Sequence, residues 1–136
     1  WRGQFATIRT FAPLLKASGD GLVVSISSIA AFTGIGSSVA YCAAKAGMDH
    51  FTRCLALDEA PLAHGAKVCS LAPGVIDTDM QVQLRGADAQ AFPDRANFKQ
   101  LKSGGQLISP DEAARRALAY LARPDFGAEP VADVRG

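Results

Sequence analysis

The chain has 136 residues, of which 49% are apolar, 20% charged and 7% aromatic. That length suits a single domain, and the apolar fraction is too high for a disordered tail. Fourteen basic against thirteen acidic side chains leave a formal net charge of +1, so the composition offers no basic field for nucleic acid. No window approaches the roughly eighteen uninterrupted apolar residues of a membrane span, so we expect no membrane association.

The chain begins with Trp1, and its first residues lack the basic segment and apolar run of a secretory signal peptide. We therefore expect it to be processed or to begin inside a longer protein. Three cysteines, Cys42, Cys54 and Cys69, form no Cys-x-x-Cys pair, and the two histidines, His50 and His64, are far apart in the sequence. This pattern predicts no disulfide framework, no metal site and a reducing, cytoplasmic location.

Helices and strands are predicted to alternate along the chain. Apolar side chains at helical spacing predict a helix near residues 5–16, although Pro13 suggests a kink or an early end. After a turn at 18–21, the β-branched run 22–27 is typical of a buried strand in a parallel sheet. A small-residue loop then leads to a long helix at 39–60, which Pro61 stops.

The second half continues the alternation. The expected elements are a strand at 67–71, a loop at 73–79, a helix in pieces at 80–101 interrupted by Gly86 and Pro93, a helix from Ser109 to about 122, and a weak strand at 129–134. Strands alternating with helices predict crossover units on a parallel sheet, an α/β fold. About three strands would leave a bare sheet edge, which proteins normally cover, so we expect part of a larger sheet.

The chemically informative residues lie between Ser28 and Lys45. Tyr41 and Lys45 stand four apart at the start of a helix and therefore share one face. Ser28 ends the first predicted strand, and open α/β sheets bind ligands at the carboxyl ends of their strands. A nearby ammonium favours the phenolate form of a phenol. With a serine hydroxyl to hold the reactant, this set suits protonation of a carbonyl oxygen while another group delivers hydride.

Simpler interpretations stand beside this one. A Tyr-x-x-x-Lys spacing also arises by chance, and a tyrosine on a helix more often packs than reacts. Ser27 competes for the serine role, but strand alternation turns its side chain to the opposite face of the sheet, which favours Ser28.

Three segments together resemble the short-chain dehydrogenase/reductase family: Ser28, the run Tyr41-Cys42-Ala43-Ala44-Lys45, and the stretch Leu71 to Thr78. The family pattern is a serine, then Tyr-x-x-x-Lys, then Pro-Gly-x-x-x-Thr after the next strand, and its order and spacing match here. The segments 77–81 and 101–110 are similar to the branch that contains sepiapterin and benzil reductases, which reduce carbonyl or vicinal dicarbonyl groups with NADPH.

The resemblance implies a role for each matching position. Tyr41 is expected to be the general acid/base, Lys45 to favour its phenolate and contact the nicotinamide ribose, and Ser28 to orient the substrate carbonyl. The expected cofactor-binding residues are Tyr41, Lys45, Pro73, Gly74, Val75, Ile76 and Thr78. The segment 80–106 is expected to form a lid over the substrate, with Met80, Leu84 and Phe92 lining a fairly apolar pocket.

The Gly-rich turn that seats the cofactor pyrophosphate in that family has no counterpart here, since Gly34–Val39 lies in the wrong element and misses the last position of the pattern. The resemblance therefore implies that residues 1–136 are the catalytic and substrate-binding C-terminal half of one Rossmann-like, doubly wound domain. The N-terminal cofactor-binding half would be absent.

The expected function is NAD(P)H-dependent reduction of a ketone or dicarbonyl substrate, with NADP as cofactor and NAD as the alternative. A second hypothesis is a non-catalytic fragment or interaction module that cannot bind the cofactor alone. By family resemblance, the first helix and the helix at 39–60 would pair across a homodimer or homotetramer interface.

Overall fold

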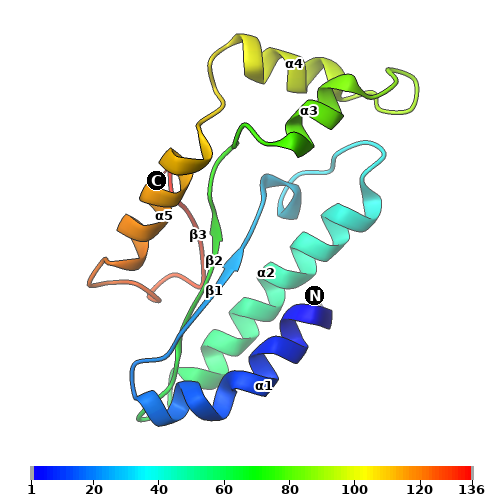
Figure 1. The fold of residues 1–136 in the computed structure, drawn as a ribbon. Coiled ribbons are helices and arrows are strands. Elements are labelled where there is room, and N and C mark those ends of the chain that lie inside the picture. Colours follow the sequence, from blue (N-terminus) through cyan, green and yellow to red (C-terminus); the bar gives the residue numbers. More distant parts are fainter. Residues whose placement is uncertain (1, 136) are drawn as a thin grey trace.

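The computed structural model describes residues 2–135 and confirms the α/β fold (Figure 1). Its strands are β1 (Leu22–Ile26), β2 (Lys67–Ala72) and β3 (Val131–Asp133), which form a parallel sheet in the order β1-β2-β3. The helices are α1 (Arg2–Ser18), α2 (Val39–Glu59), α3 (Asp79–Gly86), α4 (Arg95–Ser103) and α5 (Pro110–Leu121), and the 3-10 turn η1 spans Ile29–Ala31.

Strand register brings two chain segments to one edge of the sheet. β1 and β2 pair from Leu22 opposite Lys67 to Ile26 opposite Leu71. The ladder extends one bond further, because the amide of Ser27 donates to the carbonyl of Leu71 at 2.9 Å. The residues that follow β1 and β2 therefore leave the sheet side by side. They do so at its carboxyl edge, where the strands end and where the sequence predicts the catalytic and cofactor-binding residues.

Helices lie on both faces of the sheet, as a doubly wound arrangement requires (Figure 1). On one face, α1 and α2 pack together, and the rings of Phe5 and Phe51 meet edge to face with centroids 5.9 Å apart. On the other face, α5 and the segment after it cover a core of Cys69, Leu71 and Phe126. Every β2 residue after Lys67 is buried, because helices cover both sides of this central strand.

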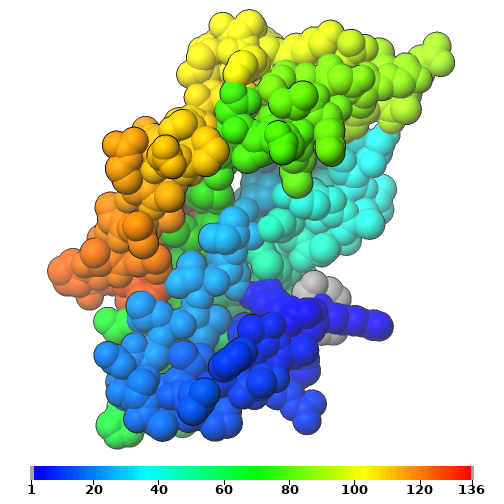
Figure 2. Space-filling view, in the orientation of Figure 1, coloured from blue at the N-terminus to red at the C-terminus, as the bar shows by residue number. Residues whose placement is uncertain are grey.

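The prediction that β1 is a buried strand is wrong on one side. Leu22, Val24 and Ile26 alternate along the strand and are 45%, 37% and 51% exposed, whereas Ser25 is buried. β1 is the edge strand of the sheet, and the core beneath α5 is built on β2 and β3. In Figure 2 the light-blue atoms of β1 lie at the surface between α1 and α5, so its outward apolar face is uncovered.

The helices begin and end at the signals that the sequence predicts, with one exception. Pro13 does not end the first helix, because α1 runs past it to Ser18 with the proline ring exposed. The α5 N-terminus forms as predicted: Pro110 occupies the first turn, and the hydroxyl of Ser109 accepts from the amide of Glu112 at 3.2 Å. Gly86 ends α3 and Pro93 precedes α4, so the segment between β2 and α5 is helical in pieces.

Candidate active site

Ser28 leaves β1 and begins η1. Its backbone is extended, and its hydroxyl oxygen accepts from the amide of Ala30 at 3.2 Å, which caps the short turn. This bond uses a lone pair of the oxygen and leaves the hydroxyl proton available to donate. The rival Ser27 is buried and donates to a carboxyl oxygen of Asp49 at 2.9 Å. Its hydroxyl proton is therefore already committed.

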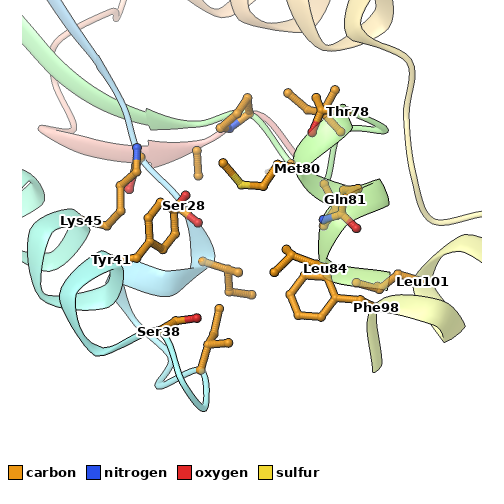
Figure 3. A pocket seen from close by; sticks show the side chains of 18 of the residues that line it. Ser28, Ser38, Tyr41, Lys45, Thr78, Met80, Gln81, Leu84, Phe98 and Leu101 are labelled. Atoms are coloured by element: carbon orange, nitrogen blue, oxygen red, sulfur yellow. The ribbon is translucent and has the colours of Figure 1, made fainter. Parts of the chain in front are cut away.

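Tyr41 and Lys45 occupy the first two turns of α2 and point to the same side of the helix (Figure 3). The ammonium nitrogen of Lys45 lies 5.7 Å from the centroid of the Tyr41 ring. It also donates to the carbonyl of Ile26 at 2.7 Å, which ties the helix to the end of β1. One of its three N–H groups is thereby fixed and the others remain for a ligand.

All eight residues predicted for the site line one cavity of about 450 Å³ at the carboxyl edge of the sheet. They are Ser28, Tyr41, Lys45, Pro73, Gly74, Val75, Ile76 and Thr78. The first three form one wall, and the loop after β2 forms another. A cavity of this size at the ends of parallel strands is typical of a small-molecule site.

Gly74 shapes the loop wall. Its φ of +85° lies in the left-handed region, where a side chain would be strained. Space is not the constraint, because a Cβ here would meet Arg135 and Ile108 at ordinary contact distances of 3.7 and 3.8 Å. Backbone conformation therefore accounts for the glycine.

Helices α3 and α4 fall in the segment predicted as the lid, residues 80–106, and line the cavity on the side opposite Tyr41 (Figure 3). Met80, Leu84 and Phe92 line it, as the sequence predicts, so this wall is largely apolar.

Two sets of polar contacts hold the lid in place. Asp77, just after β2, forms ion pairs with Arg85 of α3 and Lys102 of α4. The hydrogen bond from Lys102, assisted by Arg85, lowers the pKa of the Asp77 carboxyl from its ordinary value. In the second set, the loop before α2 contacts the lid segment, because the amide of Gly36 donates to the Asp94 carboxylate at 2.8 Å.

Behind the site, a buried carboxyl joins α2 to the sheet. Asp49 of α2 is only 4% exposed, and its two oxygens accept from Ser27 at 2.9 Å and from Ser70 at 2.6 Å. Both serines are themselves buried, one just after β1 and the other in β2. This bridge fixes the helix that carries Tyr41 against two strands.

Sequence reasoning missed several residues of the cavity wall. Gln81, Phe98 and Leu101 of the lid also face the cavity, as does Arg135 beyond β3. Helical spacing offered a signal for the lid residues, since Gln81 and Leu84 are three apart and so are Phe98 and Leu101. Nothing in the local sequence pointed to Arg135, which pairs with Asp133.

Comparison with known proteins identifies the family. A model of the short chain dehydrogenase family matches residues 1–89. A benzil reductase ((S)-benzoin forming) from Bacillus cereus is 36% identical over 107 residues, which cover 79% of this chain and 43% of that protein.

Solved structures agree. The YIR035C short chain dehydrogenase/reductase from Saccharomyces cerevisiae superposes with a TM-score of 0.74 at 29% identity, over 95% of this chain and 51% of that one. An NADPH-bound short chain oxidoreductase from Pseudomonas aeruginosa PAO1 is described as containing an atypical catalytic center. It superposes with a TM-score of 0.67 at 29% identity, over 93% of this chain and 49% of that one.

The fold and the site thus define a Rossmann-type parallel sheet with a small-molecule cavity at the carboxyl ends of its strands. The chain belongs to the short-chain dehydrogenase/reductase family. It spans about half the length of the relatives it matches.

The residues present fit one end of a nicotinamide cofactor. The hydroxyls of Ser28, Tyr41 and Thr78 and the ammonium of Lys45 line this one cavity. They are a donor set suited to ribose hydroxyls and a carbonyl. Within residues 2–135 no group of three or more His, Cys, Asp or Glu side chains is arranged to hold a metal ion. None of the described helices is both long and apolar enough to cross a bilayer.

Proposed function

We propose that the protein reduces a ketone or dicarbonyl substrate with a nicotinamide cofactor, and that Tyr41 supplies the proton. The observation that carries this proposal is the convergence of Ser28, Tyr41 and Lys45 on one cavity at the carboxyl edge of the sheet. A relative named for the reduction of benzil, a vicinal diketone, supports the substrate class.

In this proposal each residue acts at one oxygen. The hydroxyl of Ser28 donates to the substrate carbonyl and holds it beside Tyr41, whose phenol transfers its proton as the oxygen gains charge. Lys45, held by the Ile26 carbonyl, stabilises the phenolate that remains. The cofactor supplies the hydride that reaches the carbonyl carbon. General acid catalysis of this kind is typically worth about 10²- to 10⁴-fold in rate.

We place the nicotinamide end of the cofactor along Pro73, Gly74, Val75, Ile76 and Thr78, with Lys45 at the ribose. NADP is the proposed cofactor, supported by the NADPH-bound relative, and NAD is the alternative. The pyrophosphate would be held by an N-terminal half that pairs with the free edge of β1. That half would also cover the exposed side chains of Leu22, Val24 and Ile26.

The test joins this chain to the N-terminal half of the Bacillus cereus benzil reductase and follows NADPH consumption with benzil. Tyr41→Phe is expected to lower kcat by at least about 10²-fold while NADPH binding, measured by fluorescence, is unchanged. Tyr120→Phe, which alters a tyrosine packed on Phe126 beneath α5, is the matched control and should keep full activity. Turnover that survives Tyr41→Phe would contradict the proton-donor role, and a fusion that binds no NADPH would favour the interaction-module hypothesis.

We also propose a homodimer or homotetramer formed through α1 and α2. Phe11 and Leu14 of α1 and Leu57 of α2 are half or more exposed, at 50%, 67% and 77%, so apolar side chains are available on both helices. Light scattering after size-exclusion chromatography of the same fusion should give a multiple of the protomer mass. A stable monomer would contradict this assembly.

A further inference from the structure

Gln81 is the exception on the apolar lid wall. The other lid residues that face the cavity from its helices are Met80, Leu84, Phe98 and Leu101. Gln81 is only 8% exposed, and within residues 2–135 its buried Oε1 has no hydrogen-bond partner. A carboxamide offers two donors and an acceptor, and one left unpaired in an apolar wall is destabilising.

The position of this side chain points to a ligand. Figure 3 shows Gln81 on α3, across the cavity from Ser28 and Tyr41, and Gln81 belongs to the cavity lining. The unpaired Oε1 only accepts hydrogen bonds and so cannot pair with a carbonyl oxygen, but the NH₂ group of the same carboxamide can donate to one, and its nitrogen is the atom that faces the cavity in Figure 3. A bound molecule with a second carbonyl oxygen would therefore find a hydrogen-bond donor, the NH₂ group of Gln81, on the wall opposite the reacting carbonyl.

One neighbour offers a competing explanation. Arg85 lies one turn further along α3, and its buried Nη1 also has no partner among the described residues. The opposite corner of the same guanidinium is held by Asp77 at 3.3 Å. A direct hydrogen bond between Gln81 and Arg85 would give the glutamine a structural role, in which it stabilises the lid. The experiment must separate this structural role from ligand binding.

We propose that Gln81 is a specificity residue that hydrogen-bonds the second oxygen of a dicarbonyl substrate whose first carbonyl lies at Ser28 and Tyr41. This inference rests on the proposed function, because it assumes a carbonyl at that wall. It assigns selectivity between diketones and monoketones to one lid side chain, and it places the two oxygens of the substrate on opposite walls.

The test compares binding of benzil and of deoxybenzoin, which has the same carbon skeleton with one carbonyl fewer. Ligand-observed NMR titration of the 136-residue chain measures both dissociation constants and needs no turnover. The unaltered chain should bind benzil about fivefold more tightly, the usual net effect of one hydrogen bond. Gln81→Leu should bring the ratio close to one, and so should the longer, flexible Gln81→Met. Gln83→Leu, an exposed position on the same helix, should leave the ratio unchanged.

Each other outcome has a definite consequence. A preference for benzil that persists in both Gln81 variants would overturn the specificity role and leave the proposed function intact. Loss of the preference for benzil in Arg85→Lys, with Gln81 intact, would attribute that preference to a structural hydrogen bond between the two side chains. This result would also overturn the inference. If neither ketone binds the unaltered chain, the carbonyl site itself is refuted, and this inference fails with it.

Discussion

Replacing Asp49 by alanine should destabilise the chain more than any exposed substitution on α2. The carboxyl accepts from Ser27 at 2.9 Å and from Ser70 at 2.6 Å, and all three side chains are buried. Asp49→Ala therefore leaves two buried hydroxyls without their acceptor. It also disconnects the helix that carries Tyr41 and Lys45 from β1 and β2.

The magnitude follows from the cost of an unsatisfied buried donor, about 1–3 kcal/mol each. Two such donors set an upper limit of about 6 kcal/mol. Rotation of the hydroxyls toward backbone carbonyls, and removal of a buried carboxyl that was itself costly to desolvate, reduce that sum. We expect a loss of about 2–4 kcal/mol in the free energy of unfolding, a large share of the stability of a small domain.

Urea unfolding followed by circular dichroism measures this loss. Asp58→Ala alters an exposed residue of the same helix and should stay within about 0.5 kcal/mol of the parent. In the triple variant, with Asp49, Ser27 and Ser70 all alanine, no unpaired hydroxyl remains, and at least half of the lost stability should return. An Asp49→Ala chain as stable as the Asp58→Ala control, or a triple variant less stable than the single one, would refute the reasoning.

Two further predictions concern ionisation. The pKa of Asp77 is lowered mainly by its hydrogen bond from Lys102, so its contribution to stability is present above its ordinary value of 3.8 and is lost as the pH falls through the depressed folded-state pKa. Hydrogen exchange of lid amides, corrected for intrinsic rates, should accelerate below about pH 4, and Asp77→Asn should remove this pH dependence; an identical profile in the variant would argue against the ion pairs. Burial, with a smaller effect of Asp49, raises the pKa of the Cys69 thiol to about 11. At pH 8 iodoacetamide should therefore label the exposed Cys54 long before Cys69, as mass spectrometry would show, and equal labelling rates in the folded chain would contradict the buried thiol.

Local spacing accounts for the part of the site that was predictable. Tyr41 and Lys45 are neighbours on one helix, so their shared face follows from four-residue spacing alone. Ser28 and the Pro73–Thr78 loop could be placed beside them because both follow strands, and parallel strands end at the same edge. The Pro110 helix start was equally local, since its cap is made by Ser109 within the same turn.

What escaped prediction depends on tertiary context. The β-branched run of β1 would suit a buried strand, but its outward face is exposed because it stands at the edge of the sheet. Asp49 bonds Ser27, which lies 22 positions before it, and Ser70, which lies 21 positions after it. No helical or strand periodicity links residues this far apart in the sequence. Gln81 is a third case. Its helical spacing places it on the lid, but only its burial among apolar neighbours, which the sequence does not show, marks it as unusual.

The central claim is that Tyr41 and Ser28 act together on one carbonyl oxygen, and a kinetic double-mutant cycle tests it most directly. The fusion enzyme, with Tyr41→Phe, Ser28→Ala and both changes together, is assayed for NADPH-dependent reduction of benzil. Because groups that act as a unit are not additive, we predict that the double variant is about as slow as Tyr41→Phe alone. Losses that multiply across the cycle would show that the two hydroxyls act independently and would contradict the account.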